Sequence, residues 1–372
     1  MNTKLSWVII GLLCSALLFA CNAPKQQTIE VATSTRAKFE PEDGQVLLFI
    51  GQEMDAIGGL EDFNDGYLDH FDTPGGFTMY TNFSPGGNSF GHIRKGLDGI
   101  WSDDNWGDSI SNMSRQLADP DFQHLALAIG LEFVDHDAQV AKGAHDELII
   151  KLGEFIKSLG RRPVFLRIGY EFSGAWNHYD QKNYLKAFKR IRDTYEEMGI
   201  ENIAYVWQSH GWDEPMDHLE AWYPGDEYVD WVGYSFFSRF DETNMIEFAR
   251  KHKKPLFIAE ATANVSSGTT KVDGKTKEIR LDNPEQAAEA KEKWFKPFFK
   301  TIDENPDVVK AISYINCNWR SHAMWEQNPT FQGVDARLQL SEDLSAFWME
   351  ETSKAKYLKS DPKLWDHLWR KE

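Results

Sequence analysis

Hydrophobic residues gather in eight short, unbroken runs along the chain. Each run is continuous rather than alternating, which is typical of strands in a parallel sheet that is covered on both faces. The predicted strands are residues 45–50, 76–80, 124–129, 163–168, 203–207, 229–234, 255–259 and 310–315.

Helical patterns fill the stretches between these runs. One apolar stripe with helical spacing covers residues 148–159 and ends at Gly160, and a second covers residues 185–198 and ends at Gly199. Glycine directly after such a stripe is typical of a helix end, because it tolerates positive φ. A third helix is predicted over residues 285–304, which carry several large aromatic side chains.

Eight strands that alternate with helices predict a (β/α)₈ TIM barrel. The alternative is an open, doubly wound sheet, which would normally carry a glycine-rich phosphate turn after its first strand. Residues 51–55 (GQEMD) do not form such a turn. The polar residues 262–284 are expected to form a long loop after the seventh strand, on the catalytic face of the barrel.

The first residues are set apart from this pattern. A Lys at position 4 precedes an apolar run over residues 7–19, which ends at Ala20 and Cys21. The run is too short for a spanning helix and resembles a bacterial lipoprotein signal, with Cys21 as the lipidated first residue of the mature chain. An ordinary signal peptide is the alternative. The expected organisation is a signal at residues 1–20, a flexible tether at 21–40 and one catalytic domain at 41–372.

The composition of the chain indicates which kinds of molecule it binds. The net charge of −18 argues against binding to nucleic acid or to an anionic bilayer, so a membrane is expected to be reached through the lipid only. The 14 Trp and 12 Tyr residues fit a carbohydrate site, because sugar rings stack on aromatic faces. Apart from Cys14 in the signal and Cys21 at the lipid site, the chain has a single cysteine, Cys317, which is expected to be a small buried side chain without a disulfide partner.

Polar side chains follow the predicted strands, at the end of the barrel where TIM-barrel active sites lie. Glu171 follows the fourth strand and Glu260 the seventh, so the two carboxyl groups should face each other across the barrel mouth. Such a pair can act on a glycosidic bond from opposite sides. The other strand-end residues are Glu53, Asp55, Asn82, Glu132, Gln208, His210, Tyr234, Asn316, Asn318 and Trp319. Glu53, Asp55 and Glu132 could contact substrate or anchor loops.

Three segments resemble glycoside hydrolase family 26, a member of clan A. Residues 167–176 (RIGYEFSGAW) are similar to the family's strand-four motif, residues 254–260 (KPLFIAE) to its strand-seven motif, and residues 229–234 (VDWVGY) to its sixth strand. The first two motifs are reasonably specific, and the resemblance spans most of the barrel in order. Trp319 stands where the clan has a sugar-platform tryptophan.

This resemblance implies a retaining mechanism in which Glu171 is the acid/base and Glu260 the nucleophile. Glu171 then needs a raised pKa, which its apolar neighbours can supply, whereas hydrogen bonds from Tyr234 and Arg167 would keep Glu260 ionised. The expected substrate-binding residues are Tyr170, Arg167, Trp176, Tyr234, Trp319, Gln208, His210, Asn82 and Asn316.

Two departures from the family pattern bear on the substrate. Tyr170 replaces the family's usual His before the acid/base, and residues 177–179 (NHY) replace a Trp-rich tail. These departures do not affect the assignment of the two catalytic carboxylates. They make it less secure to expect the family's mannan specificity in this chain. The expected substrate is a β-mannan or β-xylan-like polysaccharide. A sulfated fucan or a β-1,3-linked xylan remains an alternative, since loops read the linkage.

The remaining alternatives concern other classes of site. A non-catalytic glycan-capture lipoprotein would be expected to have lost one carboxylate, and a sugar isomerase would need clustered metal ligands. Histidines such as His92 are scattered over different loops, so no metal or cofactor is expected. A basic group on the catalytic face could bind an anionic glycan, although ion pairs with nearby acids are favoured; it comprises Arg94, Lys95, Arg239, Arg320 and His322. The expected enzyme is a monomer on the outer membrane, facing the periplasm or the medium.

Overall fold

The structure is a computed structural model. The residues that it describes are 36–237, 243–264, 271–272, 275–276, 279–328 and 331–369. The predicted signal, with Cys21, and Arg239 lie outside these residues.

Eight parallel strands form a closed barrel, as predicted. They follow one another around it in chain order, and β15 pairs with β1 to close the ring. The strands are β1 (Val46–Gly51), β2 (Gly76–Asn82), β7 (Ala126–Glu132), β8 (Val164–Ile168), β9 (Ile203–Ser209), β10 (Trp231–Phe236), β11 (Leu256–Ala261) and β15 (Val309–Ile315). Several run past their predicted ends into polar residues such as Asn82 and Glu132, because the sheet continues toward the catalytic face.

Side chains in each strand alternate between the barrel interior and the surrounding helices. The interior holds an aromatic cluster that includes Phe49, Phe165, Trp231 and Phe257. Phe165 packs edge-on against Phe49 with ring centroids 5.3 Å apart, and against Trp231 at 5.2 Å. Both sides of every strand are therefore buried, which explains why the strands read as continuous apolar runs.

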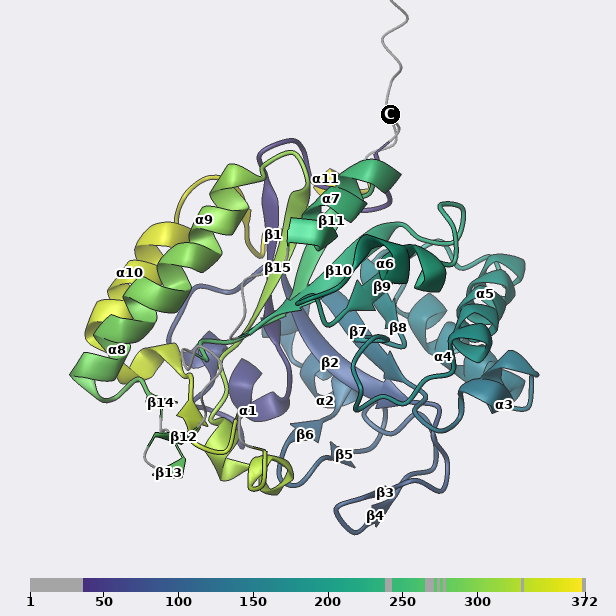
Figure 1. The fold of residues 1–372 in the computed structure, drawn as a ribbon, viewed down its shortest axis with the longest axis horizontal. Helices are drawn as coiled ribbons and strands as arrows, with labels where there is room; N and C mark the ends of the chain where they lie inside the picture. Colours follow the sequence, from purple (N-terminus) through teal and green to yellow (C-terminus); the bar gives the residue numbers. More distant parts are fainter. Residues whose placement is uncertain are drawn as a thin grey trace, which may run out of the picture. The chain divides into compact units, whose positions relative to one another are not determined.

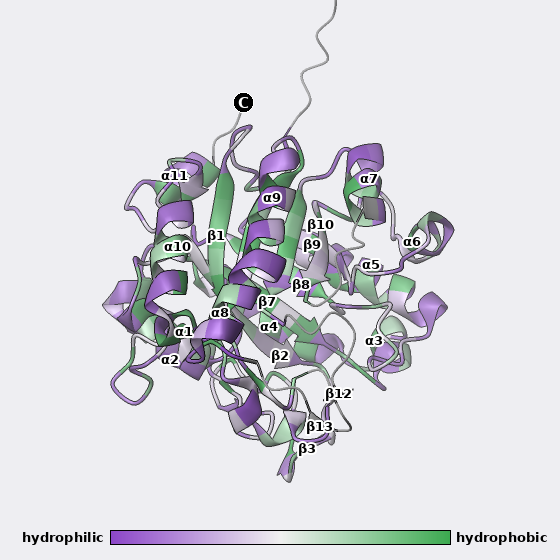
Figure 2. Ribbon diagram, turned by 60° about the vertical axis from the view of Figure 1, so that its left-hand side comes forward, coloured by the Kyte–Doolittle hydropathy of each residue, from purple (hydrophilic) through white to green (hydrophobic). Residues whose placement is uncertain are grey.

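Helices surround the barrel (Figure 1). In Figure 2 the barrel strands are largely hydrophobic, whereas α9 is divided between hydrophobic and hydrophilic residues, as expected for a helix with one face in the core. The helices are α1 (Met54–Ile57), α2 (Met113–Ala118), α3 (Asp137–Ala141), α4 (Asp146–Ser158), α5 (Gln181–Glu197), α6 (Met216–Trp222), α7 (Thr243–His252), α8 (Pro284–Ala290), α9 (Lys296–Glu304), α10 (Glu342–Thr352) and α11 (Leu364–Leu368). Among the described residues, no helix combines the length and the apolar character needed to cross a lipid bilayer.

The two clearest predicted helices are confirmed as α4 and α5. Each is followed within two residues by a glycine with positive φ, Gly160 at 63° and Gly199 at 62°. The third predicted helix is divided by a π-helical turn at Lys291–Phe295, between α8 and α9. Pro297 follows this turn and has no backbone N–H to donate to the turn before it, so the regular hydrogen-bond ladder is interrupted there.

Short two-residue strands lie outside the eight barrel strands, and the last of them, Tyr357–Leu358, pairs in parallel with the start of β1. They are β3 (Asn88–Ser89), β4 (His92–Ile93), β5 (Asp104–Asn105), β6 (Ile110–Ser111), β12 (Lys271–Val272), β13 (Lys275–Thr276), β14 (Ile279–Arg280), β16 (Val334–Asp335) and β17 (Tyr357–Leu358). The predicted loop after the seventh strand thus contains the hairpin β12–β13, and β14 pairs with β16 from the loop after β15.

Candidate active site

The acid/base candidate Glu171 lies three residues after β8, in a tight turn. Its φ of +50° is uncommon for a residue with a side chain, and strained backbone of this kind gathers at functional sites. Asn177 holds the turn, because its Nδ2 donates to the carbonyl oxygens of both Tyr170 and Glu171 at 2.9 Å. The departure from the family motif at position 177 therefore has a structural role in this chain.

The carboxyl group of Glu171 is buried and only 6% of the residue is exposed. Oε1 accepts a hydrogen bond from Ser235 Oγ at 2.5 Å, and Oε2 accepts one from Trp176 Nε1 at 2.9 Å. Burial, reinforced by the negative charge of Glu260, raises the pKa of Glu171 to about 8. Glu171 is therefore protonated at neutral pH, as a general acid must be.

Glu260, the nucleophile candidate, lies near the end of β11 and faces a positive charge. Its Oε1 accepts a hydrogen bond from the guanidinium of Arg167, which is fully buried on β8. Gln208 on β9 places Nε2 3.4 Å from the same oxygen and accepts from Arg167 Nε at 2.7 Å. The predicted contact between Arg167 and Glu260 is confirmed.

A short network joins the two carboxyl groups. Gln208 Nε2 donates to Ser235 Oγ at 3.2 Å, and Ser235 in turn donates to Glu171. This series of hydrogen bonds runs from Glu260 through Gln208 and Ser235 to Glu171. It thus joins three neighbouring strands and the turn after β8. Both carboxyl groups belong to one buried site at the C-terminal ends of the strands.

Ser235, the residue after Tyr234 on β10, joins the network by donating to Glu171 and accepting from Gln208. Tyr234, which the sequence suggested as a contact of the nucleophile, packs with the helix-facing core cluster on the outside of the barrel. Successive residues of a strand face opposite sides, so the next residue points inward. Because β10 is buried on both sides, its sequence does not show this alternation clearly, and the two positions could not be distinguished.

Two tyrosines cover Arg167. The guanidinium carbon lies 5.1 Å from the ring centroid of Tyr170 and 5.3 Å from that of Tyr80, and the two rings meet edge to face at 5.0 Å. Tyr80 Oη donates to Gln52 Oε1 at 3.2 Å. Burial raises the pKa of both phenols, so both remain neutral. Tyr170 is partly exposed and stays a candidate for substrate binding. Tyr80 and Gln52 were not predicted as site residues from the sequence.

An aromatic cluster stands beside Glu171. Trp176 is 48% exposed, and its ring lies 5.7 Å from His210 and 5.8 Å from Trp212 between centroids. His210 stacks on Trp212 at 4.2 Å, and its Nε2 lies 3.1 Å from Glu214 Oε1. Partly exposed, roughly parallel rings next to a catalytic carboxyl group form a suitable platform for a sugar ring. Trp212 escaped the sequence analysis, because only its exposure separates it from buried tryptophans.

Three residues predicted to contact substrate have polar groups that bind other parts of the protein. Asn82 donates to Asp104, and Asn316 donates to Gln339 while accepting from the backbone of Leu338. Trp319 is 1% exposed, stacks on Phe331 at 4.5 Å and donates to Thr262. These side chains anchor loops beneath the catalytic face.

The basic residues predicted on the catalytic face have different surroundings in the structure. Arg94 pairs with Glu132 at 2.9 Å and with Asp104 at 3.4 Å, and its guanidinium stacks on Trp106 at 3.8 Å. The prediction that ion pairs with neighbouring acids are favoured is confirmed for Arg94. Glu132 also accepts from Ser84 and from the backbone of Val134, so it is a loop anchor. Lys95 and Arg320 are exposed, and His322 is buried.

A model described as "Glycosyl hydrolase family 26" matches residues 103–316, which is more than half of the chain. The chain belongs to glycosyl hydrolase family 26. This family-26 protein is therefore a glycoside hydrolase, in agreement with the resemblance seen in its sequence.

Two relatives match this family-26 chain over 89% of its length. The beta-1,3-xylanase TXYA of Vibrio sp. is 30% identical over 350 residues, which cover 69% of that protein. A beta-1,3-xylanase of Alcaligenes sp. is 29% identical over 347 residues, which cover 68% of that protein.

Solved structures agree with the barrel fold. The beta-mannanase BoMan26A of Bacteroides ovatus aligns with a TM-score of 0.53 at 14% identity, covering 88% of this chain and 94% of that one. GH26C of a Muricauda species aligns with a TM-score of 0.54 at 12% identity, covering 88% and 90%. At these identities the likeness concerns the fold alone.

The pH dependence of this family-26 enzyme should report on Glu171. A general acid works in its protonated form, so kcat/KM is expected to fall as the pH rises above about 8. Ser235 stabilises the ionised form of Glu171 by donating to it, so Ser235→Ala should raise the pKa and move this alkaline limb to higher pH. Profiles of kcat/KM on a soluble oligosaccharide, recorded for both proteins, measure the shift.

Ser313→Ala is the matched control for this experiment. Ser313 is also a fully buried serine of a barrel strand, but its hydroxyl bonds Thr78 at 3.1 Å. Its alkaline limb should match that of the unmodified enzyme. A limb that moves to lower pH in Ser235→Ala would contradict the assignment.

Proposed function

We propose that this protein is a retaining, endo-acting hydrolase of β-1,3-xylan that works by double displacement. The observation that carries the proposal is the buried pair of Glu171 and Glu260. One hydrogen-bond network holds both carboxyl groups, but their surroundings differ in the way that an acid and a nucleophile require. Glu171 is kept protonated by burial, and Glu260 faces the guanidinium of Arg167. Two carboxyl groups in distinct environments suit distinct roles as acid and nucleophile.

The reaction proceeds in two steps. In the first, a carboxylate oxygen of Glu260 attacks the anomeric carbon and the glycosidic C–O bond breaks. Glu171 gives its proton to the departing oxygen, so the leaving sugar departs as a neutral alcohol. In the second, Glu171, now a carboxylate, takes a proton from water while the water oxygen replaces Glu260 at the anomeric carbon. The product keeps the original anomeric configuration, and both glutamates return to their starting states.

The choice of β-1,3-xylan has two supports. The two relatives that align over 89% of the chain are both described as beta-1,3-xylanases. In addition, the chain departs from the family motif at Tyr170 and Asn177, which lie on either side of the acid/base. Tyr170 covers Arg167 and Asn177 fixes the turn of Glu171, so both replacements alter the surface beside the bond to be cleaved.

The test is product release by the purified protein from a panel of polysaccharides. We expect β-1,3-xylan to yield a ladder of oligosaccharides, and β-1,4-xylan, β-1,4-mannan and a sulfated fucan to yield little. Proton NMR of the first products should show the β-anomer. Release of single sugars alone would refute endo action, and first products of the α-anomer would refute retention. Cleavage of mannan or fucan in place of β-1,3-xylan would refute the substrate assignment, and tight binding without cleavage would favour a glycan-capture protein.

Trp212→Ala is expected to raise KM for the polysaccharide about five- to tenfold while kcat stays within about twofold. Trp212 stacks on His210 and lies beside Trp176, and Trp176 is the ring that donates to Glu171, so loss of Trp212 should remove binding energy of about 1 kcal/mol. Steady-state kinetics measure both constants. Trp101→Ala is the control, since Trp101 is 55% exposed but packs against Phe155 of the outer helix α4. An equal rise in KM for the control would remove the platform from the proposal.

We further propose that the protein is exported and anchored by a lipid on Cys21. The support is the start of the chain, where a basic residue and an apolar run precede this cysteine. Intact-mass and peptide mass spectrometry of the protein from a bacterial host should find a mature chain that begins at Cys21 and carries acyl groups. Cys21→Ser should abolish the lipid mass. A mature N-terminus at another residue would show an ordinary signal peptide instead.

A further inference from the structure

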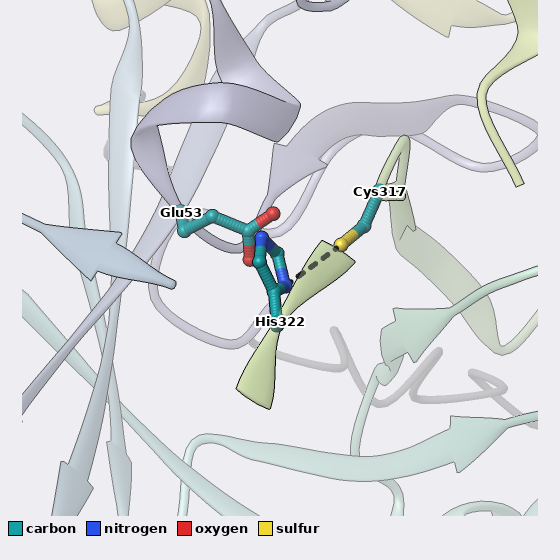
Figure 3. A group of neighbouring side chains, drawn as sticks. All are labelled: Glu53, Cys317 and His322. Carbon is teal, nitrogen blue, oxygen red and sulfur yellow. Dashed lines mark hydrogen bonds between the residues drawn. The ribbon is translucent and has the colours of Figure 1, made fainter. Parts of the chain in front are cut away.

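Three buried side chains of different chemistry converge on the catalytic face, outside the network of Glu171 and Glu260. Glu53 comes two residues after β1, and Cys317 and His322 come from the loop after β15 (Figure 3). Their exposed fractions are 1%, 1% and 3%. Cys317 Sγ lies 3.7 Å from His322 Nδ1, and one donor atom from each of the three residues lies within 4.8 Å of the other two.

One atom of this group lacks the partner that burial normally requires. Glu53 Oε2 accepts from Ser109 Oγ at 3.2 Å, whereas Oε1 has no hydrogen bond of regular geometry within the described part of the chain, and the weakly donating thiol of Cys317 is the neighbour of the carboxyl group. A buried carboxylate oxygen without a partner costs free energy, so native structures rarely leave one unexplained. Oε1 belongs to a side chain that reaches toward a thiol and an imidazole, and these are the donor types of zinc sites.

We propose that Glu53, Cys317 and His322 bind a zinc ion. In tetrahedral sites zinc binds sulfur at about 2.3 Å and nitrogen or oxygen at about 2.0–2.2 Å, which places the donor atoms about 3.5 Å apart. The observed distance between sulfur and nitrogen is close to this value, and a shift of about 1 Å by the long Glu53 side chain would bring in the third donor. Water completes the fourth position.

The charges of these groups balance at the buried site. Zn²⁺ carries two positive charges, and the thiolate of Cys317 and the carboxylate of Glu53 carry one negative charge each, while His322 binds as a neutral imidazole. Binding releases the thiol proton to solvent. The complex is therefore neutral overall, which lowers the cost of holding a divalent ion away from water. Ser109 keeps Oε2 occupied and so directs Oε1 toward the metal.

The site joins parts of the chain that are distant in sequence. Glu53 is the N-cap residue of α1. His322 directly precedes Ala323, whose backbone N–H donates to the carbonyl of Gly107 at 2.8 Å. The zinc ion would therefore tie the loops after β1 and β15 together at the point where the β5–β6 connection meets them. We infer a structural role: zinc binding stabilises this side of the catalytic face and takes no part in the glycosidic reaction.

The first test uses the full-length protein, stripped of metal by a chelator and dialysed. Titration with Co²⁺ should give one equivalent of bound metal and an absorption band of thiolate-to-cobalt charge transfer, and Zn²⁺ should displace the cobalt and abolish the band. Zn²⁺ should also raise Tm by several degrees, because it binds only the folded state. Absence of a saturable cobalt band in the unmodified protein would overturn the proposal without any variant.

Variants then assign the ligands. Cys317→Ser should abolish the charge-transfer band, and His322→Gln should weaken Zn²⁺ binding by about 100-fold or more. His92→Gln is the matched control, because His92 is an exposed histidine on a nearby pair of short strands and should bind Zn²⁺ normally. A band that persists in Cys317→Ser, or an equal loss of affinity in His92→Gln, would show that the metal binds elsewhere. Since the readouts are metal binding and Tm, they are independent of the substrate proposed above.

Discussion

Glu260→Gln is expected to lower kcat on the polysaccharide on the order of 10⁴-fold or more, because the amide cannot form the covalent glycosyl intermediate. Glu171→Gln is expected to lower kcat about 10²–10⁴-fold, the usual contribution of a general acid and base. The two variants should differ most on an aryl glycoside whose phenol is acidic. That leaving group departs without a proton, so Glu171→Gln should release one rapid equivalent of phenol and then stall at the intermediate. Glu260→Gln should show no burst.

Stopped-flow absorbance of the phenol measures both phases, and mass spectrometry should detect the trapped glycosyl group on Glu260 in Glu171→Gln. Glu154→Gln is the control, since Glu154 is an exposed carboxylate on the outer helix α4 and its loss should leave both phases unchanged. A burst in Glu260→Gln, or a glycosyl group found on another residue, would assign the nucleophile elsewhere.

Arg167→Met is expected to reduce the free energy of unfolding by about 3–5 kcal/mol. The guanidinium is fully buried and compensates the buried carboxylate of Glu260, and breaking such a pair leaves one charge without its partner. It also removes the donor to Gln208 and the cation between Tyr80 and Tyr170. Denaturant unfolding at constant pH, followed by tryptophan fluorescence, measures the change.

The double variant Arg167→Met/Glu260→Gln separates the charge effect from simple loss of packing. With no carboxylate left to compensate, it should be less destabilised than the sum of the single variants by about 1 kcal/mol or more. Arg250→Met is the surface control, because Arg250 and Asp307 are both about half exposed and their pair should contribute at most about 1 kcal/mol. Additive single changes would show that Arg167 acts through packing alone.

The barrel could be predicted from sequence because each of its strands is buried on both sides. The pattern of eight apolar runs follows directly from that burial, and every predicted strand overlaps an observed one. The positions of Glu171 and Glu260 follow from the same pattern, since polar residues directly after barrel strands lie on the catalytic face. The pairing of Glu260 with Arg167 needed only the rule that strand ends meet at one end of the barrel.

The same burial limited what could be predicted about the side chains around them. Tyr234 and Ser235 face opposite sides of β10, and because every residue of β10 is buried, the pattern does not show which side holds the catalytic residues. Trp319 and Trp212 both follow barrel strands, yet one is covered by Phe331 and the other is partly exposed. Exposure of this kind depends on how the loops pack, and loop packing has no periodic signature in the chain.

The sequence by itself determined the fold class, the family and the two carboxylates, because all three depend on local patterns and short motifs. The tertiary structure decided which neighbours set the chemistry of those carboxylates. Ser235 and Trp176 donate hydrogen bonds to Glu171, and Asn82 and Asn316 bind neighbouring loops. The tertiary structure also brought Glu53 beside Cys317 and His322. These residues come from opposite ends of the domain and meet only because β1 and β15 are neighbours in the closed barrel.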